Sequence, residues 1–151
     1  MKQSKQKFTS SLLKMGVLAT AGMTLFSYLL SIKKKEKFLE PLALNQLVYP
    51  KDKKDQAHHV LGYGLHYLVG LFFSFFYLHL FNKKIISPNG WNFTWMGFLN
   101  GLIGSLGWYI TLKLHNNPPK LKLGKYFLQL IVAHVIFGIF NGIVFKLEKK
   151  E

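Results

Sequence analysis

Two histidines, each followed by a glycine four residues later, are the side chains of this sequence best suited to chemistry. They form the pairs His66/Gly70 and His134/Gly138, each within a long stretch without Asp, Glu, Lys or Arg. Ionisable side chains are rare at membrane depth, so such residues are candidates for a functional site. A haem held between two parallel helices takes one axial imidazole from each helix. A glycine one turn away would let the flat macrocycle approach the backbone. The sequence therefore makes His66 and His134 candidate ligands of a b-type haem or contacts of a quinone.

A structural role is the alternative for the same histidines. A neutral His costs much less to bury than Lys or Asp, and hydrogen bonds between side chains of different helices help to hold membrane bundles together. The residues His59, Asn100 and Asn141 also fall on the polar faces of their helices and are expected in the bundle interior. Together with His66 they could line a small-solute or proton pathway, which four helices of this size would form only as an oligomer.

Metal and hydrolase sites are not expected. The chain has no Cys, and His59 and His66 would stand about 10 Å apart along one helix face, too far to share an ion. The apolar stretches contain no carboxylate that could neutralise a divalent cation or orient a histidine beside a Ser or Thr nucleophile. The sequence therefore predicts a protein that is not an enzyme and binds no metal.

Four charge-free stretches position these residues. A bilayer core about 30 Å thick requires roughly 20 mostly apolar residues in a spanning helix. Residues 15–32, 60–81, 91–112 and 126–145 provide 18, 22, 22 and 20 such residues. Too little polar sequence remains to cover four helices of this kind in water. The predicted fold class is an all-α integral membrane protein, with residues 1–151 as a single domain that forms a four-transmembrane-helix bundle.

Lysines gather outside these stretches. The net charge is +14, from 20 Lys, no Arg and 6 acidic residues, and the longest basic connection is 33–56. The apolar part of this connection, 38–48, is expected to lie on the membrane surface as a short helix. Four spans place nine Lys on one side and eleven on the other, so the positive-inside rule does not decide the sidedness. Each Lys near the surface attracts anionic lipid by about 1 kcal/mol. The expected partners are anionic lipid headgroups and not nucleic acid, and the sequence leaves open a homo-oligomer or a membrane-protein partner.

The two halves of the chain carry a similar set of residues. The recurring residues are Met15, Gly16, Leu18, Leu25 and Tyr28, found again 81 residues later, and His66, Gly70 and Phe72, found again 68 residues later. Two helical hairpins of the same orientation would be related by an axis along the membrane normal. The second and fourth helices would then run parallel, with His66 and His134 at matching depth.

The order of these features resembles a known group. His59 and His66 on one helix, a glycine-rich helix, a Pro-containing loop and a last helix with His134 at mid-span are similar to the YagU-like group of small bacterial inner-membrane proteins. The similar stretch covers residues 57–144. This chain departs from the pattern at Leu130, where an acidic residue would be expected one turn before the last histidine. The resemblance implies a multi-pass protein of the bacterial inner membrane and no particular activity.

Overall fold

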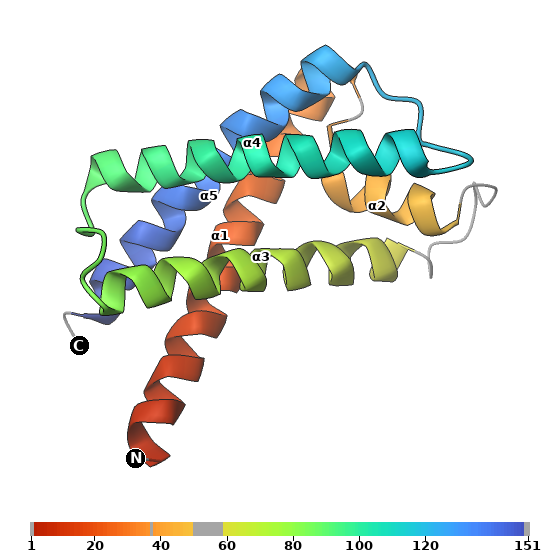
Figure 1. Cartoon of the computed structure of the whole chain (residues 1–151). Coiled ribbons are helices and arrows are strands. Elements are labelled where there is room, and N and C mark those ends of the chain that lie inside the picture. Colours follow the sequence, from red (N-terminus) through yellow and green to blue (C-terminus); the bar gives the residue numbers. More distant parts are fainter. Residues whose placement is uncertain (1, 37, 50–58, 150–151) are drawn as a thin grey trace.

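The computed structural model describes residues 2–36, 38–49 and 59–149, with the backbone alone for residues 2–5 and 59. This part of the chain contains five helices and no strand (Figure 1). The helices are α1 (Lys2–Lys34), α2 (Glu40–Val48), α3 (His59–Asn82), α4 (Gly90–Leu114) and α5 (Leu123–Glu148). The predicted all-α class is confirmed for these residues. Residues 50–58 of the predicted basic connection lie outside the described part.

Three helices are long and apolar enough to cross a membrane. The segments are Gln6–Lys34 in α1, Val60–Asn82 in α3 and Leu123–Glu148 in α5. Their outer faces present large apolar side chains, and Leu25, Leu68 and Leu128 are each more than half exposed. Exposed apolar surface of this extent marks contact with an apolar environment. These properties are those of a membrane protein.

The predicted fourth span is helical, but it is less apolar than the other three. Residues 91–112 lie within α4, whose 25 residues include five Gly and three Trp. Gly, Trp and the two Asn residues lower its mean hydropathy, and α4 is not among the three helices that qualify as spans by length and composition. Its first turn is capped by the Asn89 side chain, which accepts a hydrogen bond from the Asn92 backbone N–H over 2.9 Å.

The first helix is longer than its charge-free stretch predicts. α1 begins at Lys2 instead of residue 15, and its N-terminal end projects beyond the other helices in Figure 1. No Pro or Gly precedes Gly16 to interrupt the helix. Ser11 and Lys14 also bind the Glu148 carboxylate of α5, over 3.0 and 2.7 Å. Charge defines where a helix can enter lipid, whereas the helix itself continues into the polar segment.

The short helix predicted at 38–48 is present, but one of its faces is buried against protein. α2 packs on α3, and its residues Glu40, Pro41, Ala43 and Asn45 are buried. The approach is close because α3 has a glycine at position 62, where a Cβ would lie 2.9 Å from the Asn45 Cβ. α2 is therefore part of the helix bundle, and the prediction of a helix that lies only on the membrane surface is incomplete.

α1 lies at the centre of the arrangement. It packs against both α3 and α5, while α4 packs against α5 and α2 against α3. Glycines allow the closest contacts: a Cβ on Gly97 of α4 would lie 2.7 Å from the Cα of Val135, and one on Gly101 would lie 2.7 Å from the Cα of Ile131. Small residues permit this backbone approach in membrane helix pairs. α3 packs on α1 and α2, and α4 packs on α5, whereas α3 and α4 make few contacts with each other.

The internal repeat corresponds to equivalent helix pairs. Gly16 of α1 packs on Leu71 of α3, and the corresponding Gly97 of α4 packs on Val135 of α5. The 68-residue offset would pair Gly97 with Ile139, which lies one helical turn from Val135. The two hairpins therefore use matching glycines, but the second is shifted by about one turn.

Candidate functional site

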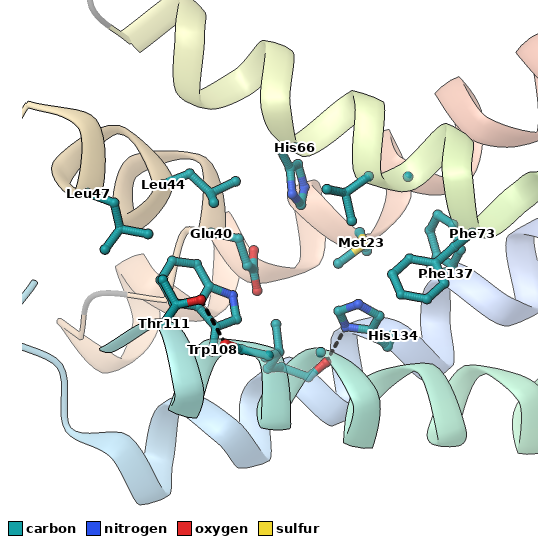
Figure 2. A pocket seen from close by; sticks show the side chains of 15 residues that line it. Met23, Glu40, Leu44, Leu47, His66, Phe73, Trp108, Thr111, His134 and Phe137 are labelled. Atoms are coloured by element: carbon teal, nitrogen blue, oxygen red, sulfur yellow. Dashed lines mark hydrogen bonds between the residues drawn. The ribbon is translucent and has the colours of Figure 1, made fainter. Parts of the chain in front are cut away.

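A cavity of about 250 Å³ lies between α3 and α4. α1 and α5 contribute Met23, Leu130, His134 and Phe137 to its wall, and α2 contributes Glu40, Leu44 and Leu47. Figure 2 shows the Glu40 carboxyl pointing into this space, with His66 and His134 approaching from different helices. Most of the lining is apolar, and its titratable side chains are Glu40, His66 and His134.

α3 and α4 are joined by the connection 83–89 and make few direct contacts with each other. Near the connection 83–89, the Asn100 Nδ2 of α4 donates to the Tyr77 hydroxyl of α3 over 3.2 Å. The rings of Phe81 and Phe93 meet there at 5.6 Å. At the opposite end α2 packs on α3, and the His115 Nε2 contacts its Leu47 carbonyl oxygen over 2.9 Å. α2 therefore helps to enclose the space between the two helices.

Glu40 is held by side chains from two other helices. Its Oε1 accepts hydrogen bonds from the Ser27 hydroxyl of α1 over 3.5 Å and from the Gln129 amide of α5 over 3.3 Å. The Gln129 amide also donates to the Ser27 Oγ. Glu40 is only 2 % exposed, and its Oε2 is buried without a partner among the described residues. Since most buried polar groups are hydrogen-bonded, an unpartnered oxygen beside a cavity is a candidate binding group.

Burial also changes the acidity of this carboxyl. It raises the pKa of Glu40 from 4.5 to about 7, although the bonds from its own backbone, Gln129 and Ser27 act in the opposite direction. The described residues that line the cavity include no Lys to compensate a negative charge. Glu40 is therefore near the midpoint of its titration at neutral pH.

His66 has one ring nitrogen committed to α1. Its Nε2 lies 2.9 Å from the Thr24 hydroxyl, and that hydroxyl donates its proton to the Thr20 carbonyl oxygen over 2.7 Å. Because a hydroxyl has one proton, Thr24 must accept from His66, which assigns the proton to Nε2. In the neutral ring, Nδ1 is then a hydrogen-bond acceptor.

His134 has the opposite tautomer. Its Nδ1 lies 2.9 Å from the Leu130 carbonyl oxygen. A carbonyl oxygen only accepts, so the proton lies on Nδ1 and Nε2 is left as an acceptor. The edge of the ring that carries Nε2 faces Gly104 of α4, where an added Cβ would lie 3.4 Å from it. The two neutral histidine rings therefore each offer an acceptor to the site, and the free Oε2 of Glu40 is an acceptor when its carboxyl is ionised.

The structure brings together two of the five residues singled out in the sequence. His66 of α3 and His134 of α5 line the same cavity. Asn100 binds Tyr77 outside the lining, and Asn141 donates to the Phe137 carbonyl oxygen over 3.0 Å within its own helix. The side chain of His59 lies outside the described residues. Of the four described side chains, Asn100 and Asn141 are not part of the cavity lining that includes His66 and His134.

The residues around the two histidines do not fit a haem. Gly138 packs closely on Gly97 and Phe93 of α4, and Gly70 packs on Thr20 of α1. The glycines expected to face a macrocycle therefore face neighbouring helices. The volume of about 250 Å³ is below the range of about 300–1,000 Å³ typical for drug-sized ligands. The carbonyl oxygens of a quinone would need hydrogen-bond donors, and the free ring nitrogens of the two neutral histidines provide none.

Sequence reasoning missed Glu40. The four charge-free stretches contain no carboxylate, but α2 brings one from outside them to the cavity that the two histidines line. The available signal is that Glu40 is the single charged residue in the apolar segment 38–48 and precedes Pro41 at the helix start. A charge that breaks an otherwise apolar segment is expensive unless it has a function or a partner.

Comparisons with known proteins give no match: no family model, no curated protein and no solved structure is similar to this chain. The resemblance to the YagU-like group stays a prediction.

Proposed function

We propose that the chain is a non-enzymatic, multi-pass protein of the bacterial inner membrane that binds a small ligand in the cavity between α3 and α4. Three helices qualify as spans, and α4 supports a fourth because residues 91–112 carry no charge. The bacterial inner membrane follows from the resemblance alone. Anionic lipid is a partner of the basic segments that flank the spans.

The free Oε2 of Glu40 is the observation that supports ligand binding. It is buried, lacks a hydrogen-bond partner among the described residues and borders a largely apolar cavity. Binding sites for small molecules typically combine an apolar wall with a few converging polar groups. Here the ionised Glu40 carboxylate and the two neutral histidine rings offer hydrogen-bond acceptors, so we propose that the ligand is a small, largely apolar molecule that carries a donor.

Fluorescence of Trp108, which lines the cavity, can test this proposal. Trp91 and Trp95 are 76 % and 49 % exposed, so a variant with Trp91→Phe and Trp95→Phe should keep its fold and report on Trp108 alone. The test compounds are benzylamine and benzyl alcohol, each with one ring and one donor group. At least one of them should change the emission in a saturable manner.

A cavity-filling variant separates binding from partition into detergent. An added Cβ on Gly107 would meet nothing within 4 Å, and Gly107 lines the cavity. Gly107→Leu should therefore occupy the space and abolish the saturable change. Gly64 also has room for a Cβ, but it is not part of the lining, and Gly64→Leu is the matched control. A response that persists in Gly107→Leu would refute the proposed binding site.

A proton pathway is the second candidate. Ion-coupled transport commonly uses a carboxylate at membrane depth, and Glu40, His66 and His134 border one cavity. Proteoliposomes with an imposed pH gradient should then show proton flux that Glu40→Gln abolishes. Equal flux from the variant and the unchanged protein would exclude this pathway.

A further inference from the structure

We infer that the ligand is a small amine in its ammonium form and that its binding displaces the proton of Glu40. This inference rests on the proposed ligand-binding function and specifies the ligand class. The step forms an ion pair between the ammonium group and the carboxylate, while the carboxyl proton leaves to the solvent. No oxidant, reductant or metal ion takes part.

The hydrogen-bonding pattern of the site matches an ammonium group. Such a group has three donors and no acceptor. The site offers the unpartnered Oε2 of Glu40 and, in the neutral tautomers assigned above, the Nδ1 of His66 and the Nε2 of His134. Trp108 contributes an aromatic surface to the same wall, and aromatic rings attract cations. A ligand with acceptors alone could bond only to the protonated carboxyl and would leave the ionised Glu40 carboxylate unsatisfied.

Charge compensation favours a monovalent cation over a zwitterion. The described lining carries one acidic side chain and no Lys. An ammonium group would neutralise Glu40, whereas the phosphate of a lipid headgroup or the carboxylate of an amino acid would enter without a counter-charge. Burying a charge without a counter-charge is strongly unfavourable. The remainder of the ligand should therefore be apolar, as Leu44, Val69 and Phe137 around it are.

The groups that face Glu40 allow it to exchange its proton near neutral pH. α3 presents His66, and α5 presents His134 and Tyr126. α1 contributes Ser27, and α4 contributes no charged residue to the lining. None of these groups supplies a permanent positive charge. With the pKa of Glu40 raised by burial to about 7, the empty site holds its proton at pH 6 and an ammonium ligand must displace it.

The two test compounds distinguish the charge of the ligand from its shape. Benzylamine is cationic and benzyl alcohol is its neutral counterpart of similar size. At pH 8, benzylamine should bind at least tenfold more tightly than benzyl alcohol. Its affinity should fall about tenfold between pH 8 and pH 6, because the ionised fraction of a group with a pKa of about 7 falls from about nine-tenths to about one-tenth. Calorimetry in two buffers of different ionisation enthalpy should show about one proton released per amine at pH 6.

The Glu40→Gln variant completes the test. It keeps the shape of the neutral carboxyl but cannot ionise, so benzylamine should bind it no better than benzyl alcohol and without pH dependence. Equal affinity of the unchanged protein for the two compounds would overturn the amine inference and leave the proposed function standing. Binding of neither compound would overturn both. Unchanged benzylamine affinity in Glu40→Gln would overturn the role of Glu40 in the ion pair.

Discussion

Replacing Glu40 by Gln should stabilise the protein at alkaline pH and leave its stability at acidic pH nearly unchanged. The pKa of this carboxyl rises from 4.5 to about 7 because the side chain is buried. Between these two values the folded state keeps a proton that the unfolded state has released. The free energy of unfolding therefore falls as pH rises through this range, and it reaches a lower plateau above about pH 7.

The magnitude follows from the two pKa values. At about 1.4 kcal/mol per pH unit, the difference between 4.5 and about 7 corresponds to about 3 kcal/mol. Between about 2 and 3 kcal/mol of this loss develops between pH 5 and pH 8. For a chain of this size 1 kcal/mol corresponds to roughly 2–4 °C in Tm, so the Tm advantage of Glu40→Gln should grow by about 5–10 °C over this interval.

Thermal unfolding in mild detergent, measured by circular dichroism at several pH values, provides the assay. The two histidines titrate in both proteins, so the difference between the two Tm profiles isolates Glu40. Glu36→Gln is the matched control, because the pKa of Glu36 is lowered by Lys122 and Lys125, 2.9 and 3.0 Å away. The stability that the ionised Glu36 contributes is lost only as pH falls through its lowered pKa. The Tm difference between Glu36→Gln and the unchanged protein should therefore change little between pH 5 and 8. Parallel profiles for the unchanged protein and Glu40→Gln would show that the carboxyl is not buried.

Two further predictions concern the helix contacts that shape the cavity. Gly62→Leu should separate α2 from α3 and lower the Tm, because a Cβ at position 62 would lie 2.9 Å from the Asn45 Cβ. Gly64→Leu should be tolerated, because a Cβ at position 64 meets nothing within 4 Å. Equal Tm values for the two variants would contradict this packing. Asn100→Leu should cost about 1 kcal/mol by removing the 3.2 Å bond to Tyr77. A double-mutant cycle with Tyr77→Phe measures this coupling in thermal unfolding, and strictly additive effects would refute the bond.

Hydropathy can be judged from a single segment of the sequence, whereas hydrogen bonds between distant segments cannot. The helical segments and the membrane character depend on the lengths of charge-free stretches, which are local, and three of the four predicted spans agree with helices apolar enough to cross a membrane. α4 shows the limit of this reasoning, because its Gly and Trp residues serve packing and lower its hydropathy. The parallel placement of His66 and His134 also follows from helix order and length.

The carboxyl group that shares the cavity with those histidines could not be predicted in the same way. Glu40 belongs to a nine-residue helix, and its place between Ser27 and Gln129 depends on α2 folding back onto α3. That contact depends on a glycine at position 62, whose importance is visible only once the two helices meet.

The sequence by itself determined the helices, their apolar surfaces and the two histidines as candidates, because each depends on composition and periodicity within one segment. Only the tertiary structure decided that α3 and α4 stand apart, that a cavity lies between them and that Glu40 reaches it. These features depend on contacts between residues separated by as many as 102 positions, as in the bond between Ser27 and Gln129. Free energies of burial and pairing arise from such contacts, and no single segment contains both partners.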